Sequence, residues 1–478
     1  MTDHKPIQLS TRWRLRTRER QTLLIIGDTI AALLALGVAL YFWASSAEWL
    51  GFSRQFFEQR VPTWFYFLPF FWLILLVELQ EISRAGSWRL TLRGVLIADL
   101  IGMGLYLVLF FYFTQPPKLV LPRLWVPGFL LSASLLTLLW RVLYIRIFTA
   151  PQFMRRIVLI GAGRTGQTIL KVINNIQPPP FHLIGVLDDD PQKIGTTLEG
   201  FSIIGSCEGL LDLINRENVS DIIVAISGEL LGSTFQILLD AHERGIEITR
   251  MPLTYEELLA RVPIRVLEAD WILRSFVDES RVNSFYELAK RLIDIFGGFV
   301  GVLILLLLFP FLSLAILIDS GRPVFYSQTR SGKQGRAYNI IKFRTMHQDA
   351  ESDGQPRWAK EVDERATRIG RFLRKTHLDE LPQFINVLRG EMSLVGPRAE
   401  RPELVQMFQT HIPFYRARLL VKPGITGWAQ INFGYAATIE ETVIKLEYDL
   451  FYIKHRNLLI DLMILLRTPA MVIGFRGR

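Results

Sequence analysis

The chain has 478 residues, half of them hydrophobic and 21% charged, and its formal net charge is +9. This length predicts two to four domains, and the composition excludes both an ordinary soluble protein and a pure membrane bundle. A basic balance is typical of proteins that meet nucleic acid, an anionic membrane or phosphorylated substrates, and the apolar segments favour the last two. The single cysteine, Cys207, excludes an intramolecular disulfide and is consistent with a reducing compartment.

Four apolar stretches in residues 1–150 are each close to the ~20 residues that cross a bilayer as a helix. They lie at 22–43, 62–79, 95–114 and 124–148. We therefore predict a transmembrane α-helical bundle of four spans. Two acids, Asp28 and Asp99, fall within or near these spans, and they fit helix–helix hydrogen bonds better than a polar transport pathway.

Arginines are distributed unevenly around these stretches. Five precede the first stretch, three lie between the second and third, and four surround the end of the fourth. The other two connections carry two basic residues each. The positive-inside rule therefore predicts that both ends of the bundle face the cytoplasm.

The region 151–275 alternates between short apolar strands and helical patterns. Strands are expected at 155–160, 184–190, 221–226 and 246–252. This alternation predicts an α/β Rossmann-like domain with a parallel sheet.

A glycine-rich turn follows the first of these strands. Gly161, Gly163 and Gly166 match the pattern G-x-G-x-x-G, and Asp188 follows where a ribose-binding acid would lie. The pattern is typical of a nucleotide site because a phosphate can approach glycine and a helix N-terminus closely. Such turns also persist for packing alone, so we favour a regulatory or scaffolding role over retained nucleotide binding.

A fifth apolar run, 292–318, contains Pro310, where a kink or break of the helix is expected. A simple fifth span would move everything after it to the outside of the cell. The following region is basic and suited to phosphorylated metabolites of the cell interior. We therefore favour a re-entrant helix that enters the membrane, bends near Pro310 and returns.

Basic residues are dense after residue 320, and one adjacent acidic pair, Asp379–Glu380, lies among them. Phosphoryl transfer needs this combination because a diphosphate repels anionic nucleophiles until cations or a metal neutralise it. Pro382 places the pair near a helix start, where neighbouring side chains diverge by about 100° and can take different roles. A helix cap and a solvated basic face are the alternatives that spacing alone leaves open.

Four motifs occur in order across residues 284–478: KFRTM, LDELPQ, MSLVGPR and KPGITGWAQ. With them the chain resembles the bacterial sugar transferase family, the polyprenyl-phosphate glycosylphosphotransferases, of the exopolysaccharide biosynthesis type. The preceding bundle and Rossmann-like domain resemble long members of the family, in which the latter domain is often described as CoA-binding-like. The resemblance implies a mainly α-helical, monotopic phosphoglycosyl transferase domain whose re-entrant helix, 292–318, bends at Pro310.

The resemblance also implies a reaction. Family members transfer a phosphosugar from a UDP-sugar to undecaprenyl phosphate in the bacterial inner membrane, releasing UMP, as the first step of exopolysaccharide or glycoconjugate assembly. Asp379 matches the family's covalent nucleophile, and Glu380 matches its Mg²⁺-linked glutamate. Four basic residues match its substrate site: Lys342, Arg344, Arg374 and Arg398. Ala399 departs from the family pattern, which has proline at this position.

Two other classes of function compete with this one. The first is a membrane-anchored, NAD-dependent nucleotide-sugar oxidoreductase that uses the glycine-rich turn. The second is a transport subunit with a cytoplasmic ligand-sensing domain. Neither explains the motifs after residue 320. The sequence leaves open the sugar, the pathway and the oligomeric state, and a homodimer is compatible with this multidomain architecture.

Overall fold

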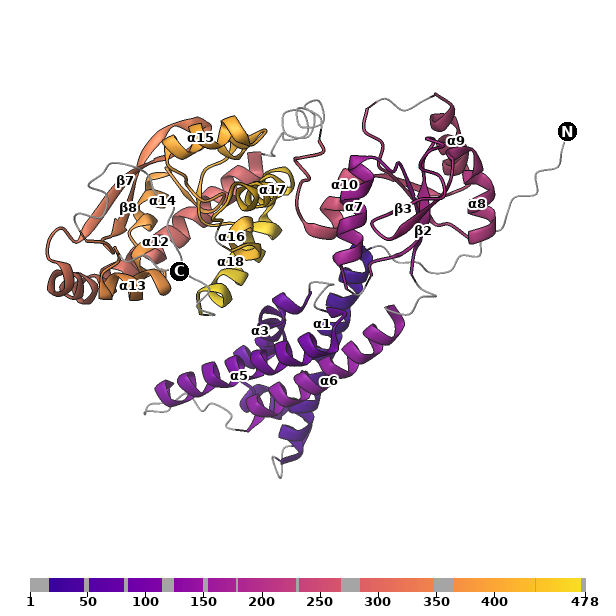
Figure 1. Cartoon of the computed structure of the whole chain (residues 1–478). Helices are drawn as coiled ribbons and strands as arrows, with labels where there is room; N and C mark the ends of the chain where they lie inside the picture. The colour runs from indigo at the N-terminus through magenta and orange to yellow at the C-terminus, as the bar shows by residue number, and fades with distance from the viewer. Residues whose placement is uncertain are drawn as a thin grey trace. The chain divides into compact units, whose positions relative to one another are not determined.

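The computed structural model describes residues 17–46, 51–80, 85–113, 124–148, 154–177, 179–228, 232–267, 284–347, 365–434 and 436–473. Contacts within the chain divide it into two compact units, Met1–Thr254 and Tyr255–Arg478 (Figure 1). The first unit contains a helical bundle and an α/β domain, and the second is mainly helical.

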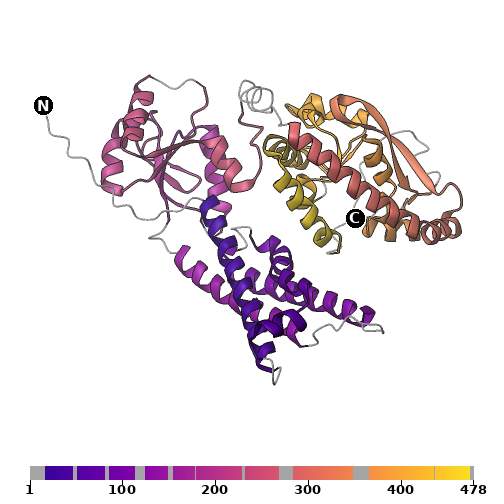
Figure 2. The same cartoon turned by 180° about the vertical axis from the view of Figure 1, so that it is seen from behind.

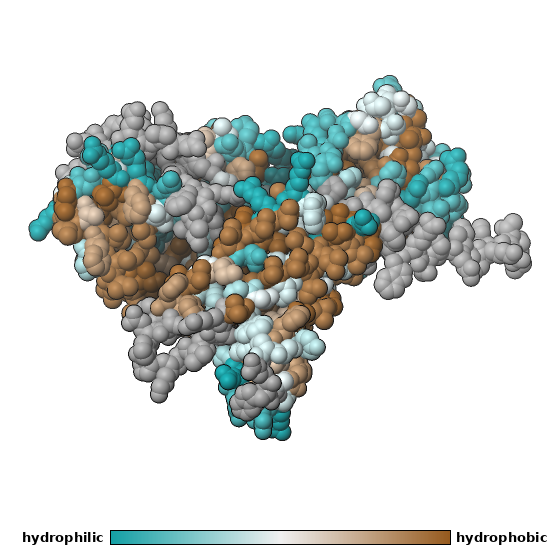
Figure 3. All heavy atoms as spheres, turned by 90° about the horizontal axis from the view of Figure 1, so that it is seen from below, coloured by the Kyte–Doolittle hydropathy of each residue, from teal (hydrophilic) through white to brown (hydrophobic). Residues whose placement is uncertain are grey.

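Three long apolar helices form the bundle: α1 (Thr17–Ser46), α5 (Trp88–Phe113) and α6 (Trp125–Phe148). Each has the length and composition to cross a membrane, and α6 packs against both α1 and α5. Large apolar side chains on their outer faces are exposed, among them Leu100, Phe111 and Leu139. Apolar side chains also cover broad areas of the surface in the space-filling view (Figure 3). Such exposure is expected where lipid takes the place of water, so these helices indicate a membrane protein.

The second apolar stretch is helical but short and segmented. It comprises η1 (Thr63–Phe67), α3 (Leu68–Leu75) and η2 (Val77–Gln80). The apolar helix from Thr63 to Leu75 rises only about 20 Å, less than the ~30 Å hydrocarbon core of a bilayer. Pro69 lies in the first turn of α3, where its missing N–H interrupts no helical bond and a new helix begins. The predicted fourth apolar helix of the N-terminal region is therefore present, but as consecutive short helical segments instead of one regular helix.

A buried ion pair joins the first and last helices of the bundle. The Arg141 Nη2 lies 2.6 Å from the Asp28 Oδ2, and neither side chain is exposed. Arg141 also donates to the backbone oxygen of Leu79 at 2.8 Å. An unpaired charge at this depth would be costly, so the pair fastens the two helices together. The interpretation of Asp28 as a helix–helix contact is confirmed.

The α/β domain contains a six-stranded sheet in the order β3-β4-β2-β1-β5-β6. Its strands are β1 (Arg156–Ile160), β2 (His182–Leu187), β3 (Thr197–Leu198), β4 (Phe201–Gly205), β5 (Asp221–Val224) and β6 (Glu247–Arg250). All neighbouring pairs are parallel except β3 with β4. Three helices pack in this domain, α7 (Arg164–Asn175), α8 (Leu210–Glu217) and α9 (Gly232–Glu243). The predicted parallel Rossmann-like sheet is confirmed, while β3 and β4 had no counterpart in the prediction.

The second unit combines helices with two small two-stranded sheets, of which the β7–β8 hairpin lies at its edge (Figure 1). The antiparallel sheet pairs β7 (Phe325–Ser331) with β8 (Ala337–Phe343), and the parallel sheet pairs β9 (Ser393–Val395) with β10 (Gly424–Thr426). Its helices are α12 (Ser284–Ser320), α13 (Arg368–Lys375), α14 (Gln383–Arg389), α15 (Pro402–His411), α16 (Trp428–Asn432), α17 (Ile439–His455) and α18 (Leu458–Ile473).

The long helix α12 lies along one face of the second unit (Figure 2). Glycines allow a close approach: an added Cβ at Gly297 would lie 2.4 Å from Leu394, and one at Gly301 would lie 2.2 Å from Phe384. The opposite face of α12 exposes apolar side chains such as Phe296, Leu307 and Phe311. The helix is continuous through Pro310. One face of α12 therefore packs against the rest of the second unit, and the other face exposes apolar side chains.

Both ends of α12 are fixed to the same unit. Near its start, Arg291 donates to the backbone oxygens of Val387 and Leu388 at 2.9 and 2.8 Å. At its end, Asp319 Oδ2 accepts a hydrogen bond from the backbone N–H of Ile369 at 3.0 Å. The two ends of this 37-residue helix are thus anchored to one globular body.

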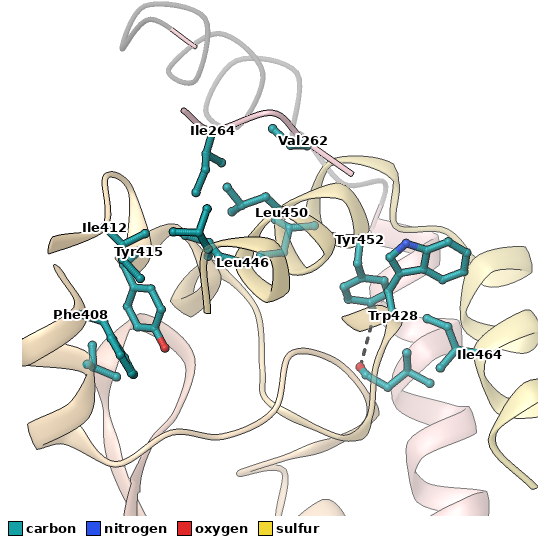
Figure 4. Close-up of a cluster of buried hydrophobic side chains, with 14 of the residues drawn as sticks. Val262, Ile264, Phe408, Ile412, Tyr415, Trp428, Leu446, Leu450, Tyr452 and Ile464 are labelled. Carbon is teal, nitrogen blue, oxygen red and sulfur yellow. Dashed lines mark hydrogen bonds between the residues drawn. The ribbon is translucent and has the colours of Figure 1, made fainter. Parts of the chain in front are cut away.

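The segment after Thr254 contributes to the core of the second unit. Val262 and Ile264 pack in the same cluster as Leu446 and Leu450 of α17 (Figure 4). Trp428 Nε1 donates to the backbone oxygen of Ala260 at 3.0 Å, so its indole serves packing in this core.

Candidate active site

The acidic pair lies in a short 3₁₀ turn, η8 (Leu378–Glu380), one turn before α14. His377 begins this turn in the left-handed conformation, with φ of 55°. Asp379 and Glu380 are both buried, with 8% and 7% of their surface exposed. Because buried carboxylates are costly unless paired, the surroundings of each acid decide its state.

Two cations from distant parts of the chain converge on Glu380. Lys342 Nζ, from β8, lies 2.7 Å from Glu380 Oε1. Arg398 Nη2, from the segment after β9, lies 2.6 Å from the same oxygen. Both contacts are charge-assisted hydrogen bonds, which are shorter and stronger than neutral ones.

The two acids are driven in opposite directions by this arrangement. Burial alone would raise the pKa of Glu380, but Arg398 and Lys342 outweigh it and hold that pKa well below its usual range. Burial raises the pKa of Asp379 to about 6, despite the opposing effect of Lys342. Asp379 also has no hydrogen-bond partner among the described residues. Glu380 is thus a fixed anion, whereas Asp379 is an available carboxylate.

Of the other two predicted substrate-binding residues, Arg374 lies near the acidic pair and Arg344 does not. Arg374 donates to Thr345 Oγ1 at 2.9 Å, and its charge lowers the pKa of Asp379, which places it near the pair. Arg344 points away: it donates to the backbone oxygens of Ser320 and Arg322, both at 2.6 Å. Strand β8 ends at residue 343, so the alternation that directs Lys342 to the site stops before Arg344. The structure therefore gives Arg344 the role of capping the end of α12.

The loop that carries Arg398 is held by bonds to three consecutive carbonyls. Arg418 Nη2 donates to the backbone oxygen of Arg398 at 2.9 Å, and Arg330 Nη1 donates to that of Ala399 at 3.1 Å. The backbone N–H of Ser331 donates to the oxygen of Glu400 at 2.9 Å. These bonds fix the backbone of the loop although proline is absent at Ala399.

Arg418 is itself part of a buried charge cluster. Its Nη2 lies 2.9 Å from Asp449 Oδ2, and Lys445 Nζ lies 2.8 Å from Glu400 Oε1. Arg418 and Asp449 are 4% and 2% exposed. From the sequence, Arg418 is only one of many basic residues in this region, because its acidic partners Glu400 and Asp449 are distant in the chain.

A pocket opens beside the pair and contains about 260 Å³ of empty space, part of it open to solvent. Its lining includes Arg330, Lys342, Glu380, Gln383 and Arg398. Gln383 was missed as a candidate, although it is the last residue of the LDELPQ motif. Three cations and one anion in this lining favour an anionic ligand.

The pair offers a limited set of ligands for a metal ion. Within the described residues, no group of three or more His, Cys, Asp or Glu side chains could hold a metal. Mg²⁺ often binds one or two carboxylates and takes its remaining ligands from water and substrate phosphates, which Asp379 and Glu380 can satisfy. Glu380 Oε1 is already shared by two cations, so Asp379 is the freer of the two ligands.

In the glycine-rich turn of the Rossmann-like domain, the acidic side chain is bonded to neighbouring groups of the protein. Asp188 accepts hydrogen bonds from the backbone N–H of Ala162 at 2.6 Å and from Lys193 Nζ at 3.2 Å. An added Cβ at Gly166 would lie 2.0 Å from the backbone oxygen of Gly161, so this glycine permits close packing. Only Gly163 has open space around it. Asp188 thus stabilises the turn itself.

Comparison with known families covers most of the chain. The sequence model of the family described as "Bacterial sugar transferase" matches residues 285–475. A model described as "CoA-binding domain" matches residues 78–252.

Three relatives show how far the similarity extends. A UDP-N-acetylgalactosamine-undecaprenyl-phosphate N-acetylgalactosaminephosphotransferase of Aeromonas hydrophila is 42% identical over 41% of this chain and 46% of that protein. An undecaprenyl-phosphate glucose phosphotransferase of Komagataeibacter xylinus is 31% identical over 66% of this chain and 58% of that protein. The chain thus spans about half the length of these two relatives. A UDP-glucose:undecaprenyl-phosphate glucose-1-phosphate transferase of Caulobacter vibrioides is 39% identical over 39% of this chain and 70% of that protein. With the matching family model and these relatives, the chain belongs to the bacterial sugar transferase family.

Proposed function

We propose that this protein transfers a sugar-1-phosphate from a UDP-sugar to undecaprenyl phosphate and releases UMP. The observation that carries this proposal is the buried pair Asp379–Glu380, in which Lys342 and Arg398 hold Glu380 while Asp379 is left unbonded. The names of the relatives support the substrate classes, but they differ in the sugar. The sugar itself is to be identified by experiment.

The proposed reaction has two displacements. The Asp379 carboxylate attacks the β-phosphorus of the UDP-sugar, and the bond from that phosphorus to the bridging oxygen breaks, so UMP leaves with the electron pair. An oxygen of undecaprenyl phosphate then attacks the same phosphorus and the Asp379 carboxylate leaves. Arg398, Lys342 and Arg374 supply positive charge around the transferring group. A covalent intermediate of this kind predicts ping-pong kinetics.

We also propose that Mg²⁺ assists this reaction, held by the carboxylate of Asp379, by Glu380 and by substrate phosphate oxygens. When bound, it would neutralise charge that develops on the phosphates. UMP release should stop when EDTA removes divalent cations and return when Mg²⁺ is added back. Release that persists in excess EDTA would remove the metal from the proposal.

For the membrane, we propose that α12 is re-entrant and that the catalytic domain faces the cytoplasm at the bacterial inner membrane. Anchoring of both ends of α12 to one unit supports this topology, because a spanning helix would separate its ends across the bilayer. The cysteine variants Ser284→Cys and Ser320→Cys should react with an impermeant thiol reagent only from the cytoplasmic side, in a Cys207→Ser background. Labelling of the two ends from opposite sides would contradict the re-entrant topology.

The test of the activity is UMP release from a panel of UDP-sugars, in nanodiscs with Mg²⁺ and undecaprenyl phosphate. Wild type should release UMP with one or more donors, and Asp379→Asn should lose at least about 10³-fold of this activity. The exposed acid Glu403 provides a matched control, Glu403→Gln, that should retain activity. Full release by Asp379→Asn would remove the nucleophile assignment.

A further inference from the structure

Gln383 stands out among the polar residues of the active-site pocket because its amide is buried and unused. It is 2% exposed and lines the pocket with Glu380 and Arg398. Its Nε2 has no hydrogen-bond partner among the described residues. A buried amide donor without a partner costs free energy, so its retention needs an explanation.

Asn386 provides an internal comparison on the same helix. It lies one turn after Gln383, on the same face of α14, and it is completely buried. Its Oδ1 accepts from the backbone N–H of Ile341 at 3.2 Å, and its Nδ2 donates to Glu391 Oε2 at 2.7 Å. The fold therefore satisfies one amide of this helix fully and leaves the other for a ligand.

Arg330 adds a second unused donor to the same pocket. Its two terminal nitrogens are engaged, since Nη1 donates to Ala399 O and Nη2 donates to Gln328 Oε1 at 2.6 Å. Its Nε is buried and has no partner among the described residues. Together with the positive charges of Lys342 and Arg398, these donors suit the non-bridging oxygens of a phosphate.

We propose that Gln383, with Arg330 beside it, forms a phosphate subsite in this pocket. The subsite would bind the α-phosphate of the nucleotide donor in the first displacement and the lipid phosphate in the second. This assignment rests on the proposed function. Attack and departure at phosphorus are roughly in line, so the entering lipid phosphate comes from the side that the nucleotide phosphate left. One subsite can therefore serve both groups in turn.

The experiment compares Gln383→Met and Gln383→Glu with wild type in two separate half-reactions. The first is exchange of labelled UMP into UDP-sugar without lipid, and the second is the lipid-dependent turnover at varied undecaprenyl phosphate. The methionine variant removes the donor at similar length, and the glutamate variant adds a charge that repels phosphate. We expect the KM for both substrates to rise about 10-fold in Gln383→Met, and further in Gln383→Glu.

The exposed Gln406 on α15 gives a matched control, since Gln406→Met makes the same change away from the pocket. Thermal unfolding checks that the Gln383 variants are folded. A rise in KM for one substrate alone would retain the subsite but assign it to that phosphate only. Unchanged KM values for both substrates in folded, active variants would overturn the subsite. Absence of UMP exchange in wild type would instead count against the proposed function.

Discussion

The glycine-rich turn of the Rossmann-like domain and the Asp379–Glu380 site both place a carboxylate beside a lysine. In the first, Asp188 is bonded by Lys193 and by the backbone of the turn itself. In the second, Glu380 is paired, but Gln383 keeps an unused amide nitrogen in the lining of a pocket. A satisfied cluster stabilises the fold, whereas unused buried groups indicate where a ligand supplies the missing partner.

The largest effect on stability is expected from the charge cluster behind the site. Arg418→Met would leave Asp449 buried without its cation and release the backbone oxygen of Arg398. Breaking a buried ion pair typically lowers stability by about 3–5 kcal/mol. Chemical denaturation of the full chain in detergent measures this change. A loss below about 1 kcal/mol would show that the cluster is not needed to hold the loop.

Arg398→Lys tests the fork that holds Glu380. The guanidinium contacts both oxygens of that carboxylate, at 2.6 and 3.5 Å, and a lysine ammonium cannot match this geometry. We expect about a 10²-fold loss of kcat. Steady-state UMP release measures it, and Arg389→Lys, at an exposed arginine at the end of α14, provides a control. Near wild-type kcat would mean that charge alone suffices at this position.

The pH dependence follows from the raised pKa of Asp379. The carboxyl must be ionised to attack, and burial raises its pKa to about 6. At a fixed Mg²⁺ concentration, kcat/KM should therefore be constant above this pH and fall about 10-fold for each pH unit below it. A pH–rate profile between 4.5 and 8 tests this. Because kcat/KM reports the free enzyme, an acid limb near the ordinary pKa of aspartate would contradict the raised pKa of Asp379.

Asp188→Asn tests the glycine-rich turn of the Rossmann-like domain. It removes the charge that Lys193 and Ala162 N–H share, so we expect a stability loss of about 1–3 kcal/mol in the Rossmann-like domain. UMP release per folded molecule should stay unchanged. Titration with NADH, followed by fluorescence, should show no difference from wild type. Saturable NADH binding that disappears in the variant would show that Asp188 does hold a nucleotide.

The smallest effect is expected at Ala399, where the family pattern has proline. The loop is already fixed by Arg330, Arg418 and the backbone of Ser331. Ala399→Pro should therefore change stability by less than about 1 kcal/mol and leave kcat within about twofold. Thermal unfolding and UMP release measure both quantities. A large gain in kcat would mean that the loop moves during turnover.

The sequence by itself determined the features that depend on local pattern. Hydropathy located the long apolar helices and α12, and the alternation of strands and helices indicated the parallel sheet. The motifs brought attention to Lys342, Asp379, Glu380 and Arg398, which the fold does bring together. These signals lie within short stretches of chain, where periodicity and composition act directly on local structure.

Only the tertiary structure decided which polar groups are used and which are left over. It turned Arg344 to the end of α12, satisfied Asp188 within its own turn, and left Gln383 without a partner. It also divided the second apolar stretch into short helical segments, which hydropathy alone does not reveal. The physical reason is that hydrogen-bond partners come from segments far apart in the sequence. Whether a buried group is satisfied is therefore a property of the assembled fold.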